Sequence, residues 1–219
     1  MWDFCNIKPV QTKEIPWGWE NIKGDNGELW VVKHPMKINM PSLVDYFDWD
    51  NYTVACPPRG KFLSLGTTNM KSTFTTAARF LSYEKLLIDQ PDLSPIADVF
   101  CEWNRYLLRV IKSIDYFIIG DDIGSNKGLI MSPSLWRTWI APQLEKLIDI
   151  GHQYDCEVIY HSDGDISAVL DDLQGMGVIA IEGERIGQMT DHLNNGAYQG
   201  MTIMENIDPR REKEHKGWQ

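Results

Sequence analysis

Apolar runs and amphipathic segments alternate along the chain from about residue 61 onward. Residues 61–65 alternate poorly between apolar and polar positions, but Gly60 and Gly66 bound the segment, which suits a buried strand. Residues 73–89 predict a helix, and a second helix is expected to open at Ser94-Pro95, because proline is tolerated in the first helical turn. In that second segment, apolar residues recur every three or four positions over 96–114, as on one face of a helix.

The second half of the chain predicts a regular succession of strands and helices. The apolar run at 116–119 is typical of a parallel strand covered on both faces. The other expected elements are strands at 157–160, 178–181 and 201–204, and helices that begin at Ser132-Pro133 and near residues 166 and 189. Strands that alternate with helices favour a parallel α/β sheet or barrel.

The first 60 residues follow a different pattern. They are rich in Trp, Pro, Gly, Asn and Asp and show weak periodicity, so we expect irregular structure with short strands. We therefore divide the chain into an irregular N-terminal part at 1–60, a βα core at 61–208 and a charged, solvated tail at 209–219.

Composition narrows the class of protein. The chain has 219 residues, of which 43% are hydrophobic, enough for one domain with its own core. It carries 31 acidic residues against 21 Lys and Arg, a formal charge of −10, with no basic cluster longer than a dipeptide. Since binding to nucleic acid or to an anionic membrane requires basic patches, we expect neither as a partner.

The cysteines and the N-terminus indicate a cytoplasmic protein. The 4 cysteines include no C-x-x-C pair, which suits isolated thiols in a reducing compartment. The N-terminus has neither the basic nor the apolar region of a signal peptide, and no apolar stretch is long enough to cross a bilayer.

An acid or a histidine follows each of the four late strands. These residues are Asp121 and Asp122, His161 and Asp163, Glu182, and Glu205. In parallel α/β folds the carboxyl ends of the strands share one rim, where active sites are built. Loop acids also cap helices, and Asp165 fits that simpler interpretation. Taken as a set, the rim residues predict a functional site.

Two chemistries fit this rim. His161, Asp163 and Glu182 can supply nitrogen and oxygen ligands to a zinc ion that keeps an open position. The same side chains can transfer protons, because crowded carboxylates raise one another's pKa values and a histidine between them carries a proton near neutral pH. The sequence leaves both chemistries open.

A series of motifs in chain order resembles a known family. The segments are Gly120-Asp121-Asp122-Ile123-Gly124-Ser125, Gly128-Leu129-Ile130-Met131-Ser132-Pro133, Pro142, His161-Ser162-Asp163-Gly164, Glu182 with Gly187-Gln188-Met189, and Ile207-Asp208. Together they are similar to the uroporphyrinogen decarboxylase superfamily, and most of all to its corrinoid-dependent methyltransferase and uncharacterised branches.

The resemblance implies a (β/α)8 barrel of the TIM type. Such a barrel typically needs roughly 250 residues, so the chain is expected to be truncated at both ends. Either partner chains close the barrel, which implies a homo-oligomer, or the chain is a partial gene product.

The resemblance also implies a function. We expect a methyltransferase that moves a methyl group between a small methylated or methoxylated compound, or a thiol, and a corrinoid carried by a partner protein. The catalytic residues implied are Asp121, Asp122, His161, Asp163 and Glu182. Where this branch has a His-x-Cys zinc pair, the chain has Asp163 in place of the cysteine, so the zinc ligands expected are His161, Asp163 and Glu182.

Two alternatives remain. The first is uroporphyrinogen III decarboxylase of porphyrin biosynthesis, which uses no cofactor. Against it, Arg59 is the only arginine in residues 1–60, and an acidic rim is a poor host for an octa-anionic substrate. The second is a non-catalytic, truncated barrel that acts as a binding module.

Overall fold

The structure is a computed structural model. It describes residues 6–11, 20–23, 29–35, 37, 47–55, 64–66, 73–110, 114–183 and 201–205. The expected helix near residue 189, the first part of the expected strand at 61–65 and the tail at 209–219 lie outside the described residues, and the three-part division of the chain stays a prediction.

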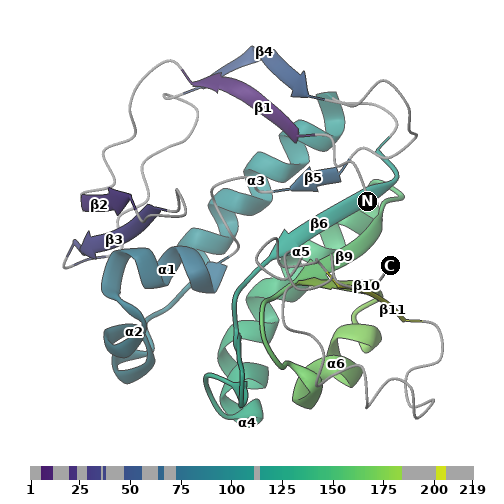
Figure 1. Ribbon diagram of the computed structural model, residues 1–219. Helices are drawn as coiled ribbons and strands as arrows, with labels where there is room; N and C mark the ends of the chain where they lie inside the picture. Colours follow the sequence, from purple (N-terminus) through teal and green to yellow (C-terminus); the bar gives the residue numbers. More distant parts are fainter. Residues whose placement is uncertain are drawn as a thin grey trace, which may run out of the picture.

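A parallel sheet of five strands forms the centre of the described structure (Figure 1). In spatial order the strands are β11 (Thr202–Glu205), β10 (Val178–Gly183), β9 (Glu157–His161), β6 (Tyr116–Gly120) and β5 (Ser64–Gly66). Every neighbouring pair is parallel. The four late strands are thus confirmed, and the protein has the expected α/β architecture. The described residues form this sheet and do not by themselves show a closed barrel.

Helices connect the strands of the sheet. The segment between β5 and β6 contains α1 (Thr73–Leu81), α2 (Tyr83–Asp89) and α3 (Ser94–Val110). The segment between β6 and β9 contains α4 (Pro133–Leu135), a π-helical turn η2 (Trp136–Ile140) and α5 (Ala141–Gln153). A 3-10 turn η3 (Ser167–Val169) and α6 (Leu170–Gly175) lead from β9 to β10.

The core lies between the sheet and these helices. α5 packs against β6 and β9, and α6 packs against β10. Phe117 of β6 and Val158 of β9 are fully buried, as the apolar runs predicted. At Gly151 of α5 an added Cβ would lie 2.7 Å from the Phe117 side chain and 2.9 Å from Val158, so the helix needs glycine here to approach the sheet this closely.

Three short antiparallel pairs lie outside the central sheet. β1 (Asn6–Gln11) pairs with β4 (Phe47–Ala55), and β2 (Glu20–Lys23) pairs with β3 (Leu29–Lys33), so strands do occur in the N-terminal part. β7 (Gly124–Ser125) and β8 (Gly128–Leu129) form a small hairpin directly after β6. Among the described helices, none has both the length and the apolar character needed to cross a membrane.

The prediction of a single helix at 73–89 is wrong, because the segment forms two helices, α1 and α2, separated at Ser82. Ser82 has φ 67° and ψ 156°, outside the helical region, and its hydroxyl accepts a hydrogen bond from the Lys85 N–H at 3.4 Å. Serine at this position therefore caps the start of α2, as serine does at many helix N-termini. The apolar spacing does not reveal this break, although the two helices differ in burial: α1 is buried on nearly every side, whereas Leu86 is the buried residue of α2.

A substitution at Gly183 tests how closely β9 and β10 pack at their carboxyl ends. A Cβ at this position would lie 2.2 Å from the Ser162 carbonyl oxygen, a contact that the backbone must move to relieve. We expect Gly183→Ala to lower the free energy of unfolding by about 1–3 kcal/mol, measured by urea denaturation. Gly175→Ala is the matched control, because a Cβ there meets open space within α6, and it should be neutral or stabilise by up to about 1 kcal/mol. Equal stability of the two variants would contradict this packing.

Candidate functional site

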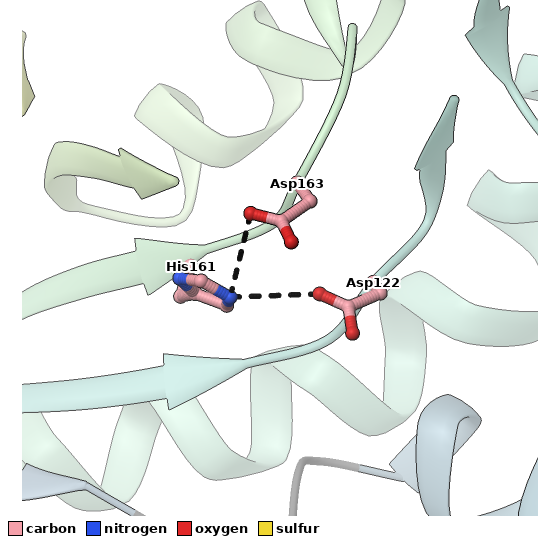
Figure 2. Close-up of side chains that lie close together, drawn as sticks. All are labelled: Asp122, His161 and Asp163. Carbon is pink, nitrogen blue, oxygen red and sulfur yellow. Dashed lines mark ion pairs between the residues drawn. The ribbon is translucent and has the colours of Figure 1, made fainter. Parts of the chain in front are cut away.

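The carboxyl ends of three neighbouring strands bring four of the predicted residues together. His161 is the last residue of β9, and the sheet register places it between Gly120 of β6 and Glu182 of β10. Asp122 follows β6, and Asp163 follows β9 (Figure 2). Because adjacent parallel strands end at the same rim, residues up to 60 positions apart in the sequence become neighbours.

The two ring nitrogens of His161 face different partners. Nδ1 lies 2.5 Å from Oε2 of Glu182. Nε2 lies 3.5 Å from Oδ1 of Asp122 and 4.0 Å from Oδ1 of Asp163, the two interactions drawn in Figure 2. An ionised carboxylate only accepts hydrogen bonds, so Nδ1 carries a proton that it donates to Glu182. The short bond to Glu182 thus fixes the ring with Nε2 facing the two aspartates.

Burial and charge act in opposite directions on His161. Burial lowers the pKa of the imidazole, but hydrogen bonding and attraction to Asp122 and Glu182 outweigh it and raise the pKa to about 9. The His161 side chain is 20% exposed and that of Glu182 only 9%, so this attraction acts in a largely desolvated place. Without a bound cation, the ring is therefore protonated at neutral pH.

Asp121 is separated from this cluster. Its carboxylate is fully buried and accepts hydrogen bonds from the Thr75 N–H at 2.7 Å, the Thr75 hydroxyl at 2.9 Å and the Phe74 N–H at 3.3 Å. Burial raises the pKa of Asp121 to about 6, although these hydrogen bonds oppose the rise. Asp121 thus anchors the first turn of α1, whereas the next residue, Asp122, lies beside His161.

The backbone around the cluster is held by further contacts. The Asp121 N–H donates to the His161 carbonyl at 2.9 Å, and the Ser162 N–H donates to the Glu182 carbonyl at 3.1 Å, so strand pairing extends to the rim. The loop after β6 is also close-packed: a Cβ on Gly124 would lie 2.4 Å from the Asp163 carbonyl oxygen. These contacts limit how far Asp122 and Asp163 can move relative to His161.

Helices α1 and α2 contribute residues that the sequence did not reveal. The Thr75 hydroxyl accepts a hydrogen bond from the Asp122 N–H at 3.0 Å. Although Tyr83 is 42% exposed, desolvation of its hydroxyl, and then the charges of Asp122 and Asp121, raise its pKa to about 12. Burial lowers the pKa of Arg79, against the effect of Tyr83 and Asp122. Because these residues lie in helices about 40 positions before the rim motif, no spacing in the sequence connects them with it.

Asp165 and Glu205 lie apart from this cluster. The Asp165 carboxylate accepts a hydrogen bond from the Ser167 N–H at 2.9 Å, a local turn contact just before η3, whose N-cap residue is Ile166 rather than the predicted Asp165. Glu205 ends β11, in register with Gly183, and its side chain is outside the described part of the structure.

Three side chains have the composition and spacing of a metal site. Asp122, His161 and Asp163 each offer one ligand atom, and these atoms all lie within 4.8 Å of one another. The predicted set was His161, Asp163 and Glu182. In the structure the Glu182 carboxylate lies at Nδ1 of His161, whereas the Asp122 carboxylate lies at Nε2, on the side of Asp163.

Comparison with known proteins supports the fold. No family model matches the chain, and no curated protein matches its sequence. Among solved structures, the chain is similar to a methyltransferase from Methanosarcina mazei, with a TM-score of 0.62 and 15% sequence identity. The match covers 88% of this chain and 61% of that one, so the chain spans about three-fifths of its structural neighbour's length. At this identity the likeness shows a shared α/β fold.

The charge state of His161 can be measured in protein freed of metal with a chelator. Because its pKa is about 9 in the folded chain and 6.5 in the unfolded chain, the protonated ring stabilises the fold below pH 6.5, and this contribution is lost as the pH rises through 9. An NMR titration of the His161 ring should have its midpoint near 9. The free energy of unfolding should fall between pH 6.5 and 9, and this fall should be smaller in His161→Gln.

A His161 midpoint below 7 would contradict the close contact with Glu182 and Asp122.

Proposed function

We propose that this chain is a metal-dependent methyltransferase, built on a barrel of the (β/α)8 type, whose zinc ion is held by Asp122, His161 and Asp163. The observation that carries the proposal is the orientation of His161: Nδ1 donates to Glu182 at 2.5 Å, and Nε2 faces two carboxylates at 3.5 and 4.0 Å. A metal-bound histidine commonly has its second ring nitrogen bonded to a carboxylate in this way.

The donor atoms fit zinc in kind, and their distances from Nε2 are close to those that zinc requires. Zinc accepts imidazole nitrogen and carboxylate oxygen at about 2.0–2.2 Å, which places tetrahedral ligands roughly 3.3–3.5 Å apart. The distance from Nε2 to Asp122 already has this value, and the distance to Asp163 is about half an ångström longer. Three protein ligands leave a fourth position open, as in catalytic rather than structural zinc sites.

The residues around the ion would have distinct tasks. Asp122 and Asp163 would balance the charge of the dication, and Glu182 would hold the proton on Nδ1 so that Nε2 stays free to bind. When bound, zinc supplies a Lewis acid that polarises a heteroatom of the substrate. Because two of three ligands are oxygens, the site is better matched to an oxygen or nitrogen donor than to a soft thiol.

These properties favour a small methoxylated or methylated compound as methyl donor. The methyl acceptor we propose is a corrinoid carried by a partner protein, on the basis of the sequence resemblance to corrinoid-dependent enzymes. The solved structure with a similar fold is itself a methyltransferase, which agrees with the proposed reaction class. Asp121 would act indirectly, through the position of α1.

Metal content tests the site directly. Purified protein dialysed against Zn²⁺ should retain one ion per chain, measured by inductively coupled plasma mass spectrometry. His161→Ala and Asp122→Asn should each weaken zinc binding by at least about 10-fold, because each removes one of three ligands. His152→Ala, which removes an exposed histidine of α5, should bind zinc as the wild type does.

Activity is tested with free cob(I)alamin as acceptor and a panel of methoxylated aromatic compounds and methylated amines as donors. Zinc-loaded wild type should form methylcob(III)alamin, detected by its visible spectrum, and His161→Ala should not. A wild-type protein that binds no zinc, with an unaltered His161→Ala variant, would overturn the metal site. Zinc binding without transfer from any donor would instead favour the binding-module alternative.

A further inference from the structure

Thr75, in the first turn of α1, contacts both aspartates that follow β6. It is buried, and its hydroxyl donates a hydrogen bond to Oδ1 of Asp121 at 2.9 Å while accepting one from the Asp122 N–H at 3.0 Å. Its own N–H donates to the same Asp121 oxygen at 2.7 Å. One side chain therefore connects the start of a helix to the two residues in which the chain turns away from the sheet.

The other side of this two-residue segment is attached to β9. The Asp121 N–H donates to the His161 carbonyl at 2.9 Å, and the Asp121 carbonyl accepts a hydrogen bond from the buried Tyr160 hydroxyl at 3.2 Å. The backbone that carries Asp122 is thus held from β9 on one side and from α1 on the other. The Asp122 N–H itself donates to the Thr75 hydroxyl, so α1 contacts the backbone of Asp122 directly.

We propose that Thr75 is a positioning residue for Asp122, and that its hydroxyl sets the affinity and geometry of the metal site formed with His161 and Asp163. This inference rests on the proposed function. Without the hydroxyl, the Asp122 N–H and the buried Asp121 carboxylate each lose a partner, and a buried group left without a hydrogen bond is costly. The strain is relieved by movement of the loop, which shifts the Asp122 carboxylate away from Nε2.

The requirement is for the hydroxyl and not for the shape of threonine. Serine keeps both hydrogen-bonding directions, whereas valine keeps the volume and loses them. Thr73 supplies a matched control in the same helix: it is buried, and within the described part of the chain its hydroxyl has no hydrogen-bond partner. Thr73→Val therefore removes a buried hydroxyl that makes no hydrogen bond among the described residues.

The experiment compares Thr75→Val, Thr75→Ser and Thr73→Val with wild type in full-length protein. Zn²⁺ affinity is measured by competition with a chromophoric chelator, and Co²⁺ loading gives a visible absorption spectrum that reports the arrangement of ligands. Thr75→Val should weaken Zn²⁺ binding by about 10–100-fold, the usual effect of losing a partner behind a metal ligand, and should alter the Co²⁺ spectrum. Thr75→Ser and Thr73→Val should match wild type in both measurements.

The outcomes separate this inference from the proposed function. If wild type binds zinc and Thr75→Val binds it equally well with the same Co²⁺ spectrum, the positioning role is overturned and the metal site remains. If serine fails as completely as valine, a purely structural need for threonine replaces the positioning role. If wild type binds neither ion, both proposals fall. Should valine prevent folding, the smaller Thr75→Ala removes the same hydroxyl without added bulk and gives the same test.

Discussion

The hydrogen bond between His161 Nδ1 and Glu182 determines how the rest of the site can work. It joins the ends of two neighbouring strands, and it is short because a protonated nitrogen meets a carboxylate in a place that is largely closed to water. Because Nδ1 already donates to Glu182, Nε2 is the ring nitrogen left to bind a substrate, a metal or a proton at the rim. Asp122 and Asp163 are close enough to act on that one atom.

The fold supplies this arrangement through strand register rather than through loops alone. Glu182 is in register with His161, and the pairing of β6 with β9 extends beyond the strand end through the Asp121 N–H. Close packing of glycines at the rim keeps the loops against the sheet. α1 is attached to the same region through the buried Asp121 carboxylate and the Asp122 N–H, so a helix from the segment before β6 contacts the residues that carry the site.

The strands that carry the site could be predicted because their apolar runs are short and continuous, and because polar residues follow each run at once. Membership of the cluster was harder to predict. Asp121 and Asp122 are chemically identical neighbours, and only the position of α1 decides that the first anchors a helix while the second lies at His161. The sequence predicts Glu182 as a metal ligand and does not reveal its bond to Nδ1 of His161, because that contact depends on the register of the two strands in the assembled sheet. Thr75 and Tyr83 had no signal at all, since both lie in helical segments with ordinary amphipathic patterns.

The proposed chemistry depends on a cation bound to one imidazole and two carboxylates at this rim. X-ray absorption at the zinc edge of the zinc-loaded protein tests it most directly, because nitrogen and oxygen ligands at about 2.0–2.2 Å are distinguished from sulfur at about 2.3 Å. We expect a shell of nitrogen and oxygen only, with the outer scattering of a single imidazole, and loss of that imidazole signal in His161→Ala. A sulfur ligand, or a shell that His161→Ala leaves unchanged, would contradict it.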